Sequence, residues 1–201
     1  MMANLKLFSG MDFSGKTTII NLIDNHLPGI FKLQSKFITN IETIEELRGK
    51  WLPSEDWKPL LQSVIKRDIA SYRNKGLILQ DSLWIIKYLA TTLERNCQED
   101  TEEIETLILL LKQYPNMDSF YLTAKYSERV NRFILREKSG QSITHSDRML
   151  HSLEKFECIE QHYRSIVLRA FPNTRIIDTN NATPEQTAHA IMHDVNFLSN
   201  F

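Results

Sequence analysis

Cysteine, glycine and proline are scarce in this chain of 201 residues, and neither sign of charge predominates. The two cysteines, Cys97 and Cys158, lie far apart and form no C-x-x-C pair, which favours reduced thiols in a cytosolic protein over a disulfide framework. The net charge is -1 at pH 7. The chain therefore lacks the strongly basic field that draws a protein onto nucleic acid or a membrane surface, and any anion that it binds must be held by local chemistry.

Long apolar runs are also missing. No segment approaches the roughly 18 consecutive apolar residues that a membrane-spanning helix needs, and the N-terminus has no basic region followed by an apolar run. The chain has no internal repeat, low-complexity tract or linker, and 42% of its residues are hydrophobic. We therefore expect a soluble cytoplasmic protein that folds as a single domain over residues 1–201, with no membrane or nucleic-acid partner.

Short apolar runs alternate with longer amphipathic segments along the chain. The runs predict strands over residues 5–9, 31–37, 77–81, 120–123 and 175–178. The longer segments predict helices over residues 16–26, 60–74, 82–93, 102–113, 127–137, 147–170 and 184–198. Strands separated by helices indicate a parallel sheet with right-handed crossovers. We therefore expect an α/β fold, a five-stranded parallel sheet with helices on both faces, whose ligands bind beyond the carboxyl ends of the strands.

Two of the six glycines stand close together in the segment GMDFSGKTT, residues 10–18, directly after the first expected strand. The segment fits the spacing G-x-x-x-x-G-K-[ST] of the phosphate-binding loop called Walker A. Glycine allows several backbone N–H groups to point inward at phosphate oxygens, and the positive end of the following helix faces the same oxygens. Lys16 then carries charge to the outer phosphates, and Thr17 offers a hydroxyl to Mg2+. The alternative is a chance glycine turn at the start of a helix.

The residues after the third and fourth expected strands separate three classes of phosphate-loop protein. A regulatory GTPase has D-x-x-G and N-K-x-D motifs, whereas Trp84 stands three residues after Asp81 and the segment 124–127 reads AKYS. A motor-type ATPase usually has a second acidic residue beside the first, but Ser82 follows Asp81. The third class, a small-molecule kinase, is therefore favoured.

With these motifs the chain resembles the thymidylate kinases and related nucleotide and nucleoside kinases. The phosphate loop of that family typically reads G-x-D-x-x-G-K-T, and GMDFSGKTT matches it, with Asp12 as the acidic residue. Four other segments are similar to the family. LILQDS is similar to its third strand, and FYLTAKYSERVNRFILR to the strand and helix before the lid. SDRML and FECIEQHYRSI are similar to the segment after the lid, and RIIDTNNATPEQTAHAI to the last strand and helix. The resemblance implies a P-loop NTPase fold with a short lid at about residues 137–147, and ATP and Mg2+ as cofactors.

The loop motif, the expected edge of the sheet and the resemblance together assign expected roles to individual residues. ATP is expected to contact Gly10, Ser14, Gly15, Lys16, Thr17, Thr18, Arg132 and Asn180. Mg2+ is expected at Thr17 and Asp81, and the phosphoryl acceptor near Asp12, Lys36, Arg67 and Asp81. Catalysis is expected from Asp12, which handles the acceptor hydroxyl, and from Lys16, Arg136 and Arg148. Two alternatives stay open: Asp81 can cap the next helix, and Arg67 can be a surface charge.

Arginines on the helix before the expected lid supply positive charge that Met11, Phe13 and Ser14 do not. Arg129, Arg132 and Arg136 are spaced i, i+3, i+7 and share one helix face.

If the expected lid closes, Arg136 and Arg148 on either side of it move over the phosphates. Arg132 can stack on the adenine, because guanidinium planes pack well on rings. The alternative is a solvated basic face, and we expect that face for Arg129.

Two departures from the family keep the identity of the acceptor open. Ser82 stands where the family has an arginine, and the segment 34–37 reads QSKF where the family has Arg-Glu-Pro. Both positions normally grip the acceptor monophosphate, so the acceptor can be a nucleoside monophosphate, an uncharged nucleoside or another small molecule. The leading hypothesis is an ATP- and Mg2+-dependent phosphotransferase. The second is a regulatory nucleotide-binding protein of the same fold that has lost kinase activity.

Two further features have less specific interpretations. The mostly apolar segment 104–111 can pair two copies of the chain as a homodimer, or it can lie in the core. His189 and His193 are spaced i, i+4, as in metal-binding helices, but no third ligand accompanies them in the sequence, and we interpret them as surface histidines.

Overall fold

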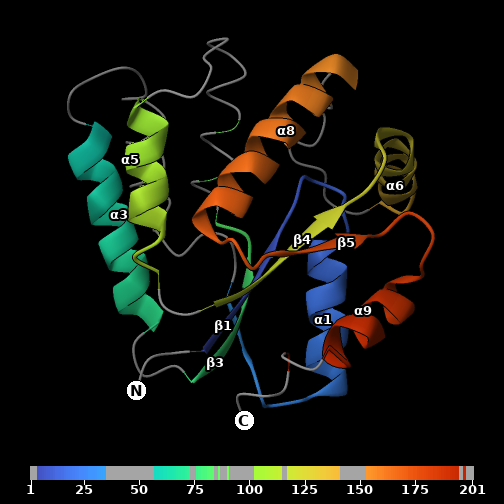
Figure 1. The fold of residues 1–201 in the computed structure, drawn as a ribbon. Helices are drawn as coiled ribbons and strands as arrows, with labels where there is room; N and C mark the ends of the chain where they lie inside the picture. The colour runs from blue at the N-terminus through green and yellow to red at the C-terminus, as the bar shows by residue number, and fades with distance from the viewer. Residues whose placement is uncertain are drawn as a thin grey trace.

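A computed structural model of the protein describes residues 4–34, 57–72, 76–83, 86, 90, 102–114, 117–140, 153–194 and 197. Within these residues the strands form one parallel five-stranded sheet in the order β2-β3-β1-β4-β5 (Figure 1). The strands are β1 (Asn4–Ser9), β2 (Lys32–Gln34), β3 (Leu77–Asp81), β4 (Met117–Thr123) and β5 (Arg175–Asp178). The α/β fold with five parallel strands that the sequence predicts is confirmed.

The described helices are α1 (Lys16–His26), α3 (Trp57–Tyr72), α5 (Glu102–Leu111), α6 (Tyr126–Lys138), α8 (Leu153–Ala170) and α9 (Pro184–Met192). Helix α1 has the predicted bounds, because Gly15 enters it in a left-handed conformation and the N–H of Leu27 closes its last turn on the Ile23 carbonyl. Ser82 was predicted to start a helix, but it is not helical, since its φ of 60° is also left-handed.

Helix α9 begins at a capping box and ends earlier than predicted. The Thr183 hydroxyl accepts a hydrogen bond from the Gln186 N–H, and the Gln186 side chain accepts one from the Thr183 N–H. The helix stops at Met192 rather than residue 198, because the chain then turns and brings Phe197 into the core, where its side chain is fully buried. Tertiary packing therefore overrides the local helical pattern.

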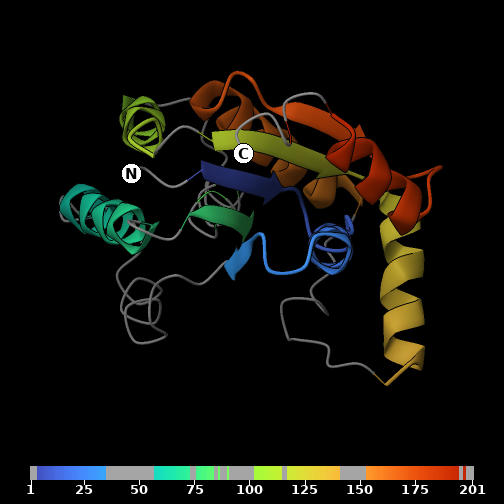
Figure 2. The same cartoon turned by 90° about the horizontal axis from the view of Figure 1, so that it is seen from below.

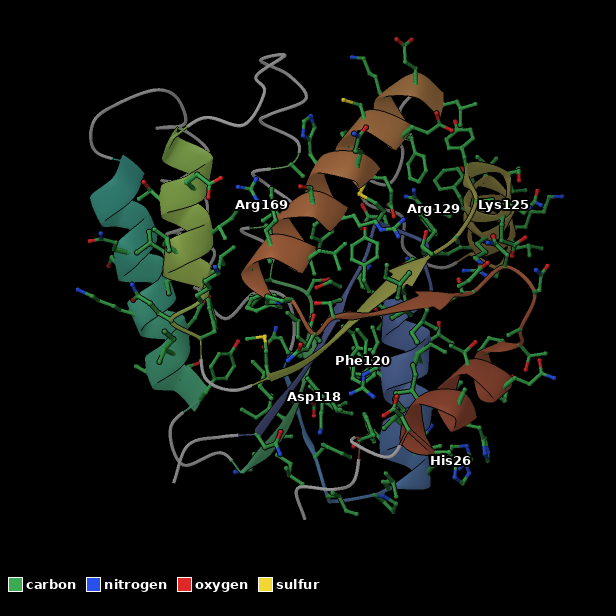
Figure 3. All side chains as sticks on the ribbon, in the orientation of Figure 1. His26, Asp118, Phe120, Lys125, Arg129 and Arg169 are labelled. Carbon is green, nitrogen blue, oxygen red and sulfur yellow. The ribbon has the colours of Figure 1, made fainter. Side chains whose placement is uncertain are left out.

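Strand β4 starts three residues earlier than predicted because its polar residues are paired across the sheet. The Asp118 carboxylate contacts the Lys6 ammonium of β1 and lies 3.8 Å from the Arg175 guanidinium of β5 (Figure 3). Lys6 is only 1% exposed and stands directly opposite Asp118 in the register of the two strands. Charges on three neighbouring strands thus meet around a buried ammonium group, an arrangement that local apolar runs do not indicate.

Alternate side chains of the sheet enter two separate apolar cores. Leu5 and Leu7 of β1 pack with α3, α5 and α8, whereas Phe8 packs with α1 and α9. This alternation follows from the pleat of a strand, whose successive side chains point to opposite faces. Figure 2 shows α3 and α5 on one side of the sheet and α1 and α9 on the other, so that both faces are covered, as is usual for a parallel sheet.

The carboxyl ends of the strands share one edge of the sheet, where β1 leads into α1, β4 into α6 and β5 into α9 (Figure 1). Strands β3 and β2 lie on one side of β1 and strands β4 and β5 on the other, so the connections change direction at β1, and ligands of such sheets bind at this switch point. The predicted phosphate loop lies there. None of the helices in the described part of the chain combines the length and the apolar composition that crossing a bilayer requires.

Candidate functional site

The loop between β1 and α1 owes its shape to positive φ angles at three positions. Gly10 has a φ of 137° and Gly15 a φ of 95°, which glycine adopts without a steric penalty. A Cβ atom on Gly10 would lie 2.2 Å from the Leu122 carbonyl oxygen, so this position also excludes any side chain. Phe13 adopts a φ of 62° although it is not glycine. Such a curled backbone can turn successive N–H groups toward a bound anion.

Lys16 opens α1 and folds back along the loop, where its Nζ donates a hydrogen bond of 2.9 Å to the Met11 carbonyl. Thr17 and Thr18 follow it in the first turn, and both are exposed. This turn contains no acidic residue, so no carboxylate of its own neutralises the positive end of the helix. An ammonium group, two hydroxyls and a helix N-terminus therefore meet at one end of the loop, which is chemistry suited to a phosphate group.

Thr17 and Asp81 are in direct contact. The Thr17 hydroxyl donates a hydrogen bond of 2.7 Å to a carboxylate oxygen of Asp81, the last residue of β3. Ser82 holds the same carboxylate from the other side at 3.3 Å, and its N–H donates to the Phe8 carbonyl of β1 at 2.9 Å. Behind them, the buried Gln80 amide donates to the Ser82 carbonyl at 2.9 Å. The carboxylate is thus fixed beside the loop, and its role in a magnesium site stays a prediction.

Arg132 of α6 joins the loop to the segment after β5. Its Nη1 donates to the Phe13 carbonyl and to the Thr179 hydroxyl, each at 3.1 Å, and its Nη2 donates to the Thr179 carbonyl at 2.7 Å. Thr179 in turn lies 3.2 Å from the carbonyl of the buried Ser14. Arg132 therefore lies against the loop, and its stacking on adenine stays a prediction. The sequence assigns Thr179 no role of its own, although its position directly after a predicted strand places it at the edge of the sheet where ligands bind.

The expectation that Arg129 lies on a solvated face is wrong. Its side chain is only 2% exposed and lies between α6 and α8 (Figure 3). The guanidinium carbon lies 3.8 Å from the centre of the Phe156 ring of α8, and Nε donates a hydrogen bond to the Asp12 carbonyl of the loop. Sequence reasoning missed this residue because spacing along α6 does not indicate that α8 covers this side of the helix.

A carboxylate of α8 accompanies the buried guanidinium. Burial lowers the pKa of Arg129 to about 10, and the negative charges of Glu160 and Asp12 oppose that shift. Burial likewise raises the pKa of Glu160, while the Tyr121 hydroxyl, Arg129 and Lys16 oppose the rise. Arg129 and Glu160 therefore compensate one another's charge directly behind the loop.

The remaining predicted residues lie at the same edge where the structure describes them. Asp12 is partly exposed, and the exposed Arg136 has its guanidinium carbon 5.8 Å from the centre of the Phe13 ring. The Asn180 side chain accepts a hydrogen bond of 2.7 Å from the Lys125 N–H, which joins the loops before α6 and α9.

Three of the predicted residues are not described at this site. Lys36 and Arg148 lie outside the described residues, as do residues 141–147 of the expected lid. Arg67 belongs to α3, but its side chain is not among those described.

An open cavity of about 440 Å³ lies beside this edge, between the start of α6 and α8. It is lined by Thr123, Ala124, Lys125, Tyr126, Ser127, Leu153, Phe156, Glu157, Glu160 and Asn180. None of residues 10–18 lines this cavity. The described phosphate-loop surface and this cavity are therefore separate features of the site.

The fold is that of P-loop nucleotide and nucleoside kinases. The thymidylate kinase from Candida albicans superimposes with a TM-score of 0.62 at 20% identity, over 94% of this chain and 89% of that one. The deoxyadenosine kinase from M. mycoides with bound dATP gives a TM-score of 0.61 at 14% identity, over 96% and 99% of the two chains. The thymidylate kinase from Ehrlichia chaffeensis gives 0.57 at 14% identity, over 96% and 98%.

These likenesses are confined to three-dimensional structure. Neither models of known protein families nor curated protein sequences give a match to this chain. At 14–20% identity the solved structures establish the fold. The chemistry must therefore be argued from the residues of this chain.

Proposed function

We propose that the protein is a kinase of small molecules that transfers the γ-phosphoryl group of ATP to an acceptor hydroxyl or phosphate. The observation that carries the proposal is the 2.7 Å contact between Thr17 and Asp81 at the start of α1, next to the curled loop. A hydroxyl and a fixed carboxylate beside a phosphate-binding loop are the groups that P-loop enzymes use to hold Mg2+.

The loop and the first turn of α1 would hold the donor. The backbone at Gly10, Ser14 and Gly15 would surround the phosphates, with the ammonium of Lys16 at the outer ones and Thr18 beside them. Thr17 and Asp81 offer oxygen ligands, the donor type that Mg2+ prefers. When bound, Mg2+ would neutralise part of the charge on the phosphate oxygens.

Cations around the loop would stabilise the transferring group. Arg136 approaches the Phe13 ring at the outer side of the loop, and Arg132 already lies against it. We propose that Arg136 and Arg148 contact the phosphates in the closed complex and that Arg132 contacts the adenine. Asp12, whose position in the loop is partly exposed, would orient the acceptor hydroxyl and accept its proton.

The acceptor is proposed to be a nucleoside monophosphate, as in thymidylate kinases, or an uncharged nucleoside or related small molecule. Lys36, Arg67 and Asp81 are the residues proposed to meet it. The similar solved structures support both acceptor types: one is named a thymidylate kinase, which supports the monophosphate, and another a deoxyadenosine kinase, which supports the nucleoside. Ser82 favours the uncharged one, because a neutral hydroxyl beside Asp81 supplies no cation for a monophosphate.

An acceptor panel tests this proposal. ATP consumption is measured with Mg2+ and a series of nucleosides, nucleoside monophosphates and small alcohols. At least one acceptor is expected to stimulate ADP release well above the rate without acceptor. Tight ATP binding with no stimulation across the panel would instead support a regulatory nucleotide-binding protein that has lost kinase activity.

We propose a cytoplasmic location and neither nucleic-acid nor membrane partners, in keeping with a net charge of -1. Homodimer formation through α5 is a further proposal. Ile108, Leu110 and Leu111 of α5 are buried in the core of the chain, whereas Leu109 is 62% exposed and available to a second copy. Sedimentation of the purified chain tests this, and a monomer at all concentrations would contradict it.

A further inference from the structure

Two arginines of α6 hold consecutive carbonyl groups of the phosphate loop. Arg129 donates from Nε to the Asp12 carbonyl, and Arg132 donates from Nη1 to the Phe13 carbonyl at 3.1 Å. The two arginines are three residues apart and so lie on one side of the helix. The outermost turn of the loop is therefore attached to α6 at two adjacent peptide groups.

These contacts suit the demands of an anion-binding loop. When the N–H groups of a curled backbone point inward at a phosphate, the carbonyls of the same peptides point outward and need donors of their own. Guanidinium groups supply them through charge-assisted hydrogen bonds, which are stronger than those between neutral groups. The bond to Phe13 falls on a residue with a φ of 62°, a strained conformation for a side chain that is not glycine.

Arg129 packs against α8 in an environment that carries negative charge. Its guanidinium carbon lies 3.8 Å from the centre of the Phe156 ring, and the negative charges of Glu160 and Asp12 favour its charged form. Only 2% of the residue is exposed, whereas the Arg132 side chain is 26% exposed. A buried, stacked guanidinium has little rotamer freedom, so Arg129 can fix the position of the loop more strictly than a surface arginine can.

We propose that Arg129 is a positioning residue that holds the Asp12–Phe13 turn of the phosphate loop in its binding-competent conformation before a nucleotide arrives, with Glu160 as its balancing charge. The inference rests on the proposed function, because it concerns the same nucleotide site. It adds a device that links α8, through Phe156 and Glu160, to the backbone of the loop. Arg129 acts through the Asp12 carbonyl and touches no phosphate.

Three variants separate positioning from plain structural support. Arg129→Met keeps the apolar packing on Phe156 but removes the donor and the charge, and so leaves Glu160 without its partner. Glu160→Gln removes the balancing charge alone. The double variant removes both charges together and is expected to recover much of the stability that Arg129→Met loses, because no unpaired buried charge remains.

The decisive measurements are ATP–Mg2+ affinity by calorimetry, thermal unfolding, and hydrogen exchange of residues 10–16 without nucleotide. Arg129→Met is expected to bind ATP roughly ten- to a hundredfold more weakly, the size of one lost charge-assisted hydrogen bond. The double variant is expected to bind ATP as weakly as Arg129→Met does, although its stability recovers. Its loop amides are expected to exchange faster than those of the wild type. Recovery of affinity together with stability would overturn the inference, because Arg129 would then be structural support only.

Arg169→Met is the matched control. This variant removes an arginine of α8 that pairs with Glu105 of α5, away from the loop, and it is expected to leave ATP affinity unchanged (Figure 3). The wild-type titration keeps the two proposals distinguishable. If the wild-type chain binds no ATP, the proposed function fails. If the wild type binds ATP and Arg129→Met binds it equally well, the positioning role of Arg129 alone is wrong.

Discussion

Gly10 passes directly against the backbone of Leu122, so that a Cβ atom on Gly10 would lie 2.2 Å from the Leu122 carbonyl oxygen. This contact places the first glycine of the phosphate loop between β1 and β4, at the centre of the sheet. The packing of β1 beside β4 therefore requires a glycine at the first position of the loop motif.

Gly10→Ala is expected to destabilise the fold and to distort the loop. Gly29→Ala is its control, since Gly29 also has a positive φ, of 78°, but nothing lies within 4 Å of the added Cβ atom. The control should cost only the left-handed penalty, roughly 1–2 kcal/mol. Gly10→Ala should cost at least about 2 kcal/mol more in the free energy of unfolding, measured with denaturant, because of backbone overlap. Equal losses in the two variants would contradict the close contact.

Asp81→Asn tests the proposed binding of Mg2+ by Thr17 and Asp81. An amide oxygen at this position can still accept the Thr17 hydrogen bond, so stability should change little, but the negative charge is gone. ATP affinity in the presence of Mg2+ should fall roughly tenfold or more, whereas affinity in EDTA should hardly change. Calorimetric titrations with and without the metal measure both. If the ATP affinity of the variant depended on Mg2+ as much as that of the wild type, Asp81 would not be a ligand of the metal.

Thr183→Ala tests the start of α9. The Thr183 hydroxyl accepts the Gln186 N–H at 3.2 Å, and the substitution leaves this N–H without its cap. The expected loss is about 1 kcal/mol of unfolding free energy by denaturant titration, with ATP affinity unchanged because the cap lies outside the proposed site. Thr183→Ser, which keeps the hydroxyl, should retain most of the stability. A loss of similar size in both variants would show that the hydroxyl is not the cause.

The raised pKa of Glu160 predicts that the stability of the protein depends on pH. Burial raises its pKa above the ordinary value of 4.5, so between 4.5 and the raised pKa the folded chain binds more protons at this site than the unfolded chain does. The contribution of Glu160 to stability is therefore fully present below pH 4.5 and is lost as the pH rises through the raised pKa. The glutamine of Glu160→Gln cannot titrate, so this variant lacks the contribution of residue 160 to the change of stability with pH.

The difference in unfolding free energy between the wild type and Glu160→Gln isolates that contribution. Measured with denaturant from pH 4 to pH 8, wild-type stability relative to the variant should decline with rising pH, by at most about 1.4 kcal/mol per pH unit. A difference that stays flat, or that grows with pH, would mean that burial does not disfavour the charged form of Glu160.

Local patterns were sufficient to predict the sheet and the loop. The segment GMDFSGKTT predicts both the loop and the bounds of α1, because glycine spacing and the helix start are local properties of the chain. The contact between Thr17 and Asp81 could be predicted as well. Asp81 ends β3, and Thr17 stands in the first turn of the helix that follows the adjacent parallel strand β1.

The features that the sequence did not reveal depend on packing between distant segments. Arg129 has the spacing of a surface arginine, and only the placement of α8 over α6 buries it. Asp118 has a polar neighbour in sequence and reads as a loop residue, yet it pairs with Lys6 across 112 positions of the chain. Thr179 likewise acts through contacts with Arg132 that no motif marks. Such pairings follow from tertiary structure, which a single sequence does not display.

The proposed function depends on the binding of a nucleoside triphosphate by the loop backbone and Lys16. Calorimetry of the wild type and of Lys16→Ala with ATP and Mg2+ tests it most directly, with circular dichroism to show that both are folded. The wild type should bind with a stoichiometry of one per chain, and the variant should bind at least about tenfold more weakly. If the wild type did not bind ATP, or if a folded Lys16→Ala variant bound it equally well, the loop and Lys16 would not be the nucleotide site.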